Sequence, residues 1–303
     1  MPEALEAEAP PRRVIYGNGR ETGTRWLARQ EWAQPAAVCR ERLQRWQSGP
    51  FAGSQSLEVE ALQISTKAEV YLARGEQGRA VVKLHRNPAA FAREHFALTL
   101  LGAGEAAPCP RLLAADEEHC LLVMEHIPRL FRVDTPEGFR GLLEGLGRVH
   151  GVGRRERTLL LELFGQPGPE DYLATFHSSA AAVDASAYVA AMKLLAADQG
   201  PDYLPVALLD LKWGHARQRE DGSLAFVDVE TFSPGVPEAF DLLQALNMVS
   251  PGYLPDRQDW TAALGAYLAG RGEPWELAAR AERYHEVIRL MAVSFGLQEL
   301  VAA

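Results

Sequence analysis

Two short apolar segments, each ending in an aspartate, constrain this chain more than any other feature. The first segment, Val206–Leu209, leads to Asp210, and the second, Leu224–Val227, leads to Asp228. Between them Arg219–Gly222 ends in Asp-Gly, which is a strong signal for a turn between paired strands. The spacing therefore predicts a hairpin of these two strands with both carboxylates at neighbouring strand ends. Such carboxylates either hold a divalent cation against a phosphate or simply cap two turns.

The composition is that of a soluble globular protein. The chain has 303 residues, of which 47% are hydrophobic and 23% charged, enough for one large or two modest domains. Its apolar runs are too short to cross a membrane, and its acidic, proline-rich start is unlike a signal peptide. Cys39, Cys109 and Cys120 fit neither a disulfide framework nor a zinc site, so a cytoplasmic location is expected. The net charge of −9 argues against nucleic-acid binding and fits a cationic substrate.

The first 56 residues are expected to form an N-terminal extension. Residues 1–14 have the composition of a disordered segment, and residues 24–47 carry an apolar stripe typical of a helix that is interrupted or restarts at Pro35. Two roles stay open for this extension: it packs on the folded core, or it contacts a protein partner.

Residues 57–85 read as three strands because apolar side chains alternate or run together there. The turn after the first strand holds Ser65, Thr66 and Lys67, which can donate hydroxyl, backbone and ammonium hydrogen bonds to a phosphate. The alternative is an ordinary hairpin turn with a solvated lysine. In the third strand Lys83 interrupts an apolar run, which indicates either a paired lysine or an edge strand with its ammonium in water.

Most of the remaining chain is predicted to be helical. The periodic apolar segments are 91–101, 137–150, 172–195, 259–268 and 275–290. Near the end of the second of these, His150 is expected to be a core histidine or a partner of the helix dipole rather than a catalyst.

The catalytic part of the sequence resembles that of the protein-kinase-like superfamily, and most of all its aminoglycoside and choline phosphotransferases. Protein kinases carry H-R-D-L-x-x-x-N and then D-F-G, and the small-molecule kinases carry a related pair of motifs. Asp210 to Lys212 resembles D-L-K, His215 stands where those kinases have asparagine, and Asp228 to Glu230 resembles the metal-binding aspartate strand.

Other motifs of that superfamily occur in the expected order. Lys83 resembles the lysine of V-A-I-K, and Glu94 in the following helix is its expected ion-pair partner. Residues 107–113 resemble the family pattern V-P-V-P-R-V-L, and residues 124–128 resemble the M-E-Y-L-P hinge. Asp241 resembles the aspartate that braces the catalytic loop in related kinases.

The resemblance implies an α+β fold of two lobes: a small N-lobe built on an antiparallel sheet and a mostly helical C-lobe, preceded by a helical extension. The expected boundaries are 1–56 for the extension, 57–123 for the N-lobe, and 124–303 for the hinge and the C-lobe with the catalytic hairpin.

The same resemblance implies an ATP-dependent kinase that phosphorylates a hydroxyl of an aminoglycoside, amino alcohol, nucleoside or sugar. Asp210 would accept or orient the hydroxyl proton, and Lys212 would contact the transferred phosphate. Mg²⁺ would be held by Asp228 and His215. The implied ATP-binding residues are Ser65, Thr66, Lys67, Lys83, Glu94, Glu125 and Ile127.

Two departures from the family pattern leave alternatives open. Mg²⁺ prefers oxygen, so His215 weakens or removes one metal contact, or favours Mn²⁺ instead. The phosphate-covering turn also lacks glycine. These departures favour a pseudokinase that binds nucleotide or acts as a scaffold. A kinase of lipopolysaccharide-core or other glycan sugars is favoured if one basic patch gathers Arg129, Arg132, Arg154, Arg155 and Arg157.

Overall fold

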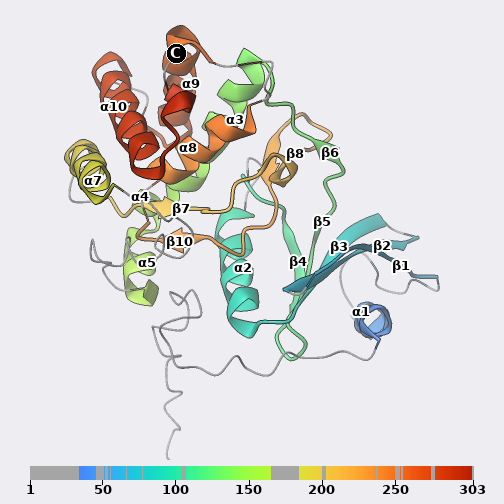
Figure 1. Cartoon of the computed structure of the whole chain (residues 1–303). Coiled ribbons are helices and arrows are strands. Elements are labelled where there is room, and N and C mark those ends of the chain that lie inside the picture. Colours follow the sequence, from blue (N-terminus) through green and yellow to red (C-terminus); the bar gives the residue numbers. More distant parts are fainter. Residues whose placement is uncertain are drawn as a thin grey trace, which may run out of the picture.

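The structure is a computed structural model. It describes residues 34–45, 51, 54, 56–65, 67–76, 78–103, 107–164, 184–199, 203–236, 238–249, 253, 255–273 and 277–301. These residues form a sheet-based lobe and a mostly helical lobe, joined after the last strand of the larger sheet (Figure 1).

The N-lobe is an antiparallel five-stranded sheet with a helix on each face. Its strand order is β1-β2-β3-β5-β4. The elements are α1 (Pro35–Arg45), β1 (Glu58–Ile64), β2 (Ala68–Gly75), β3 (Gly78–His85), α2 (Pro88–Leu101), β4 (Leu112–Asp116) and β5 (Leu121–Glu125). The three strands expected between residues 57 and 85 are therefore confirmed.

Side chains along β3 point alternately to the two faces of the sheet, so α1 and α2 contact different residues of this strand. Val82 and Leu84 are fully buried in a cluster with Cys39 and Leu43 of α1. Since successive side chains of a strand point to opposite faces, Lys83 and its neighbours at odd positions face α2 instead. The described part of the N-terminal extension thus packs on the core, and the helix does begin at Pro35.

The described part of the C-lobe is built from helices, a two-stranded sheet and a three-stranded sheet. Its helices are α3 (Pro136–His150), α4 (Val152–Arg155), α5 (Arg157–Phe164), α7 (Ala185–Gln199), α8 (Ala239–Met248), α9 (Arg257–Gly270) and α10 (Leu277–Phe295). The short turns η1 (Trp213–His215) and η2 (Gln298–Val301) are 3₁₀ helices. Its strands are β6 (Arg129–Leu130), β7 (Val206–Ala207), β8 (Ala216–Gln218), β9 (Leu224–Phe226) and β10 (Ser233–Pro234).

Glycines let α3 and α9 approach closely. A Cβ atom on Gly147 would lie 2.1 Å from the Tyr267 carbonyl oxygen, and one on Gly270 would lie 2.3 Å from the Glu144 carbonyl oxygen. Any side chain at either position would therefore push the two helices apart.

The predicted hairpin between Val206–Leu209 and Leu224–Val227 is wrong in its first strand. β9 pairs with β8, whereas β7 pairs with β10. The Asp-Gly turn is tight, with Gln218 opposite Leu224, so its first arm reaches back only to residue 216. Asp210 therefore lies in a loop before the hairpin, not at the end of one of its strands.

The other predicted helices correspond to α2, α3, α9 and α10. Of the segment 172–195, the part before residue 184 lies outside the described residues, and the rest belongs to α7. The domain boundaries stay a prediction. None of the helices among the described residues has the length and apolar character needed to cross a membrane.

Candidate functional site

Lys83 lies at the centre of a charged cluster that joins the two lobes. Its Nζ atom is 2.8 Å from a carboxylate oxygen of Glu94 on α2, which confirms the expected ion pair. It is also 2.6 Å from Asp228 and 3.2 Å from Glu230, both in the segment after β9. The Lys83 side chain is only 8% exposed, so one buried ammonium is shared by three carboxylates.

The charges of this cluster shift both partners of the ion pair toward their ionised forms. Burial alone would lower the pKa of Lys83, but Glu94, Asp228 and Glu230 outweigh it and raise this pKa. Burial alone would raise the pKa of Glu94, but Lys83 and His85 lower it to about 2. Lys83 and Glu94 are thus both ionised at neutral pH.

Glu94→Gln is expected to lower the free energy of unfolding near neutral pH, on the order of 3 kcal/mol from the lowered pKa. Because the folded-state pKa of Glu94 lies below its ordinary value of 4.5, its contribution is complete above that pH and is lost as the pH falls toward 2. Urea unfolding of both proteins across this range measures the difference. Glu41→Gln, on the exposed face of α1, is the control. A difference that stays constant with pH would contradict this assignment.

The loop that carries Asp210 is braced by α8. The buried carboxylate of Asp241 accepts hydrogen bonds from the backbone N–H groups of Leu208 (2.6 Å) and Leu209 (2.9 Å). Gln244, one turn later, accepts from the Leu211 N–H (2.9 Å) and donates to the Leu209 carbonyl (3.1 Å). These bonds hold Leu209 in a left-handed conformation, with φ of 67°. The bracing expected of Asp241 is therefore present.

His150 is a buried structural histidine, as expected. Its Nε2 lies 3.0 Å from Asp241 Oδ2, and its Nδ1 lies 3.0 Å from the Tyr267 hydroxyl. The His150 ring thus holds the Asp241 carboxylate, which in turn holds the loop that carries Asp210. His150 makes no hydrogen bond with Asp210 itself.

Asp210 is partly open to solvent. One of its carboxylate oxygens is 2.7 Å from Lys212 Nζ, and the side chains of the two residues are 34% and 62% exposed. The other oxygen has no hydrogen-bond partner in the described part of the chain. This arrangement leaves one oxygen to bind a hydroxyl, with an ammonium beside it.

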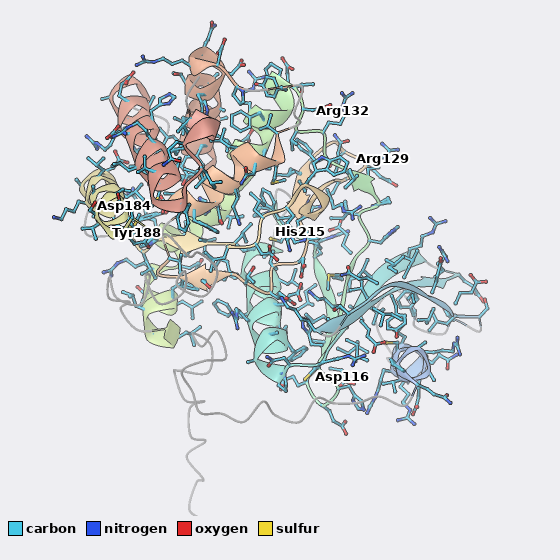
Figure 2. All side chains as sticks on the ribbon, viewed as in Figure 1. Asp116, Arg129, Arg132, Asp184, Tyr188 and His215 are labelled. Carbon is cyan, nitrogen blue, oxygen red and sulfur yellow. The ribbon has the colours of Figure 1, made fainter. Side chains whose placement is uncertain are left out.

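Asp228 and His215 face each other. His215 lies between the lobes (Figure 2). His215 Nδ1 is 2.9 Å from the carbonyl oxygen of Asp210, which can only accept, so Nδ1 carries a proton. In the neutral ring Nε2 is then unprotonated, and it lies 3.5 Å from Asp228 Oδ2. Asp228 itself is held at a φ of 63°. A nitrogen lone pair and a carboxylate oxygen at this separation fit adjacent ligands of one divalent cation.

The turn expected to cover phosphates is only partly described. The Ser65 hydroxyl accepts from the N–H groups of Lys67 (3.2 Å) and Ala68 (3.1 Å) and donates to the Ala68 carbonyl, so it closes the turn. Lys67 is exposed. Thr66 lies outside the described residues. Phosphate binding by this turn stays a prediction.

The hinge places Glu125 and Ile127 after β5. The Glu125 N–H donates to the Arg111 carbonyl (2.9 Å), and the Glu125 side chain binds Arg219 (3.0 Å). The N–H of Ile127 makes no hydrogen bond with the described residues. The Ile127 N–H therefore remains able to bind an adenine.

Sequence reasoning missed three residues of this region. Arg219 bonds Glu125 and also the carbonyls of Ala107 (2.9 Å) and Cys109 (2.7 Å), which ties the β8–β9 hairpin to the N-lobe. Nothing in the sequence indicated those distant contacts. His85 Nε2 lies 2.7 Å from Glu94, and Glu230 binds Lys83. His85 shares a strand face with Lys83, so alternation could have suggested it.

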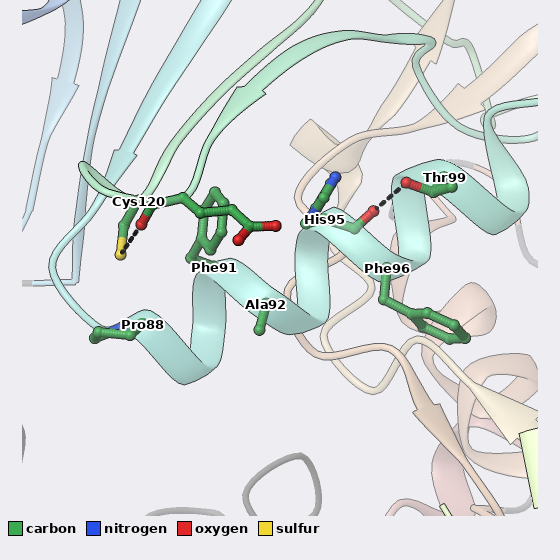
Figure 3. A pocket seen from close by; sticks show the side chains of 8 residues that line it. Pro88, Phe91, Ala92, His95, Phe96, Thr99 and Cys120 are labelled. Carbon is green, nitrogen blue, oxygen red and sulfur yellow. Dashed lines mark hydrogen bonds between the residues drawn. The ribbon is translucent and has the colours of Figure 1, made fainter. Parts of the chain in front are cut away.

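A hollow of about 530 Å³ lies on another face of α2 (Figure 3). It is lined mostly by apolar side chains: Pro88, Phe91, Ala92, His95, Phe96, Thr99, Glu117 and Cys120. None of the residues of the Lys83 cluster lines it, so we do not assign the substrates to it.

The five arginines considered for a glycan surface do not form one patch. Arg129 belongs to β6, and Arg132 follows this strand and pairs with Asp134. Arg154 and Arg155 belong to α4, at the opposite side of the C-lobe (Figures 1 and 2). Arg154 is 3.0 Å from the buried Glu273.

Similarity to known proteins is found by structure and not by sequence. No protein-family model and no curated protein matches the sequence. Among solved structures, the chain is similar to the macrolide 2'-phosphotransferase MphH of Brachybacterium faecium, with a TM-score of 0.51, 19% identity, and coverage of 83% of this chain and 93% of that one.

Two further structures have the same fold. An ethanolamine kinase of Plasmodium vivax matches with a TM-score of 0.53 and 14% identity over 82% of this chain and 78% of its own. A protein of Ralstonia eutropha described as an aminoglycoside phosphotransferase matches with a TM-score of 0.52 and 14% identity over 88% and 93%. The predicted α+β fold with two lobes is thereby confirmed as the fold that these three solved structures share.

Proposed function

We propose that the protein transfers the terminal phosphate of ATP to a hydroxyl group of a small molecule. One observation carries this proposal: Lys83, Glu94 and Asp228 meet between the lobes, next to a braced loop that presents Asp210. Fold alone does not define an activity, but these groups have the charges and positions that phosphoryl transfer requires. The acceptor classes we favour are aminoglycosides, amino alcohols, nucleosides and sugars.

Binding of the nucleotide falls to the N-lobe and the hinge. Lys83, kept in place by Glu94, supplies a positive charge for the α- and β-phosphates. Ser65, Thr66 and Lys67 supply further donors from the turn after β1, and the hinge backbone at Glu125 and Ile127 supplies donors and acceptors for adenine. The three cysteines are unpaired and buried, which supports a cytoplasmic location for such an ATP-dependent enzyme.

Asp228 and His215 would hold the metal ion, whose charge offsets that of the phosphates during transfer. Asp210 orients the acceptor hydroxyl and takes its proton, because its free oxygen lies in an exposed position on a rigid loop. Lys212 stabilises negative charge on the phosphate that is transferred. The protein thus acts mainly by positioning groups and neutralising charge.

His215→Asn is expected to change the metal preference of the enzyme. An imidazole nitrogen favours Mn²⁺ over Mg²⁺ more than an amide oxygen does, so the ratio of kcat/KM with Mn²⁺ to that with Mg²⁺ should fall about tenfold. Asp228→Asn, the control, should lose activity with both ions. An unchanged ratio in His215→Asn would show that His215 does not bind the metal.

The two alternatives have less support. The separation of the arginines removes the observation that would favour a glycan kinase. In this chain the loop of Asp210 is held rigidly, and one oxygen of Asp210 is left able to bind a substrate. A pseudokinase would need neither feature.

Nucleotide-induced stabilisation tests the proposal without knowledge of the acceptor. ATP with Mg²⁺ or Mn²⁺ should raise the Tm of the wild type. Lys83→Met should lose most of this response, and Arg140→Met, at an exposed position on α3, should keep it. If the wild type shows no response with either ion, the proposal fails.

A further inference from the structure

Arg93, on α2, is partly buried without a partner. Its Nε atom is inaccessible to water and makes no hydrogen bond, and the residue has no ion pair with any part of the described chain. Burial lowers the pKa of Arg93, and the carboxylate of Glu230 only partly opposes this effect. Burying a guanidinium without a hydrogen-bond partner destabilises the folded protein. The buried position of Arg93 therefore needs an explanation.

Two other buried or partly buried arginines of this chain are each stabilised by a glutamate. The Nε atoms of Arg86 and Arg271 are also buried and unpaired. In both, however, an Nη atom binds a glutamate: Glu69 at 2.5 Å and Glu238 at 3.1 Å. In the described part of the chain Arg93 has no such glutamate, which leaves its Nη groups able to bind a ligand.

The position of Arg93 on α2 turns its side chain toward the segment that follows Asp228. Glu94, the next residue, faces Lys83 and the sheet. Phe96, three residues after Arg93, lies on a neighbouring face of α2 (Figure 3), and its ring centre is 6.3 Å from that of Phe232. Arg93 therefore faces the segment between Asp228 and Phe232, from which Glu230 reaches Lys83.

We propose that Arg93 is a substrate-binding residue that takes a phosphate group between the lobes. This inference rests on the proposed function and adds a second cationic contact to Lys83. Guanidinium groups bind phosphate through charge-assisted hydrogen bonds, and the phosphate compensates the buried charge. The phosphate belongs either to the nucleotide or to an acceptor that already carries one. An anionic acceptor would need such a cation, because Glu94, Asp228 and Glu230 would otherwise repel it.

The first test uses inorganic phosphate as the probe, against chloride at equal ionic strength. Phosphate should raise the Tm of the wild type and of the exposed control Arg140→Met. In Arg93→Met the affinity for phosphate should fall about tenfold or more, as expected for loss of a charged hydrogen bond. The same phosphate response in Arg93→Met and wild type, or no response in either, would overturn the proposal for free phosphate.

Titration with ATP and metal shows whether Arg93 binds a phosphate of the nucleotide or a phosphate of the acceptor. Weaker ATP binding by Arg93→Met, with unchanged adenosine binding, assigns the nucleotide phosphates. Unchanged ATP binding, with phosphate binding still lost, assigns the acceptor. Equal binding of both phosphate and ATP by the variant and the wild type overturns the proposal. If the wild type binds phosphate but neither variant nor wild type binds ATP, the proposed function fails instead.

The stability of the ligand-free variant is a further readout. Because Arg93 has no partner among the described residues, Arg93→Met should unfold at the same temperature as the wild type or at a higher one. A structural arginine would give the opposite result, and a clearly lower Tm for ligand-free Arg93→Met would count against a substrate-binding role.

Discussion

Asp210→Asn is expected to lower kcat by about 10²–10⁴-fold, because the amide cannot take the proton of the acceptor hydroxyl. The fold should be unaffected. The Asp210 side chain is one third exposed and, among the described residues, binds Lys212 alone. The backbone of its loop is held by Asp241 and Gln244. Steady-state turnover and nucleotide-induced thermal shifts, measured on the same preparation, separate the two effects.

Nucleotide binding provides the internal control for this variant. Asp210→Asn should keep the Tm increase that ATP and metal produce in the wild type, since Asp210 is not among the groups around Lys83. Asp221→Asn, in the exposed hairpin turn, should keep full turnover. Wild-type turnover in Asp210→Asn would show that this carboxylate is not the base.

Asp241→Ala is expected to destabilise the protein by about 3–5 kcal/mol and to abolish turnover. The carboxylate is fully buried and accepts from the N–H groups of Leu208 and Leu209, and it also contacts the ring of His150. Its removal leaves two buried backbone donors unpaired, each of which costs about 1–3 kcal/mol, and a buried imidazole without its partner. Urea unfolding measures the loss of stability.

Asp241→Asn separates stability from catalysis. The amide keeps one acceptor oxygen, so this variant should be destabilised less than Asp241→Ala but should still position the loop poorly. Asp134→Ala, in an exposed pair with Arg132, should unfold like the wild type. A stable Asp241→Ala protein with normal turnover would refute the bracing role.

Local sequence rules were sufficient for much of this fold. Apolar alternation predicted the strands up to residue 85, and periodicity predicted α2 and α3. An apolar strand around Lys83 left open whether this lysine is paired or solvated, and its pairing with Glu94 came from the resemblance to kinases. The bracing by Asp241 came from resemblance, and the backbone hydrogen bonds confirm it.

Long-range contacts were beyond those rules. The Asp-Gly turn suggested that the strand before Asp210 pairs with β9, but this tight turn pairs β8 with β9 instead. Arg219 looked like a turn residue, although its guanidinium reaches Glu125 and two carbonyls more than ninety residues away. Likewise, only packing of α2 against the C-lobe reveals that Arg93 has no partner.

The most direct test of phosphoryl transfer uses ATP labelled in its terminal phosphate. Wild type, Asp210→Asn and Asp228→Asn would each be incubated with Mg²⁺ or Mn²⁺ and pools of aminoglycosides, amino alcohols, nucleosides, sugars and their phosphorylated forms. We expect label to appear in at least one acceptor with the wild type alone. Label transfer that is equal in all three proteins, or absent with the wild type in every pool although ATP binds, would contradict the assignment as a small-molecule kinase.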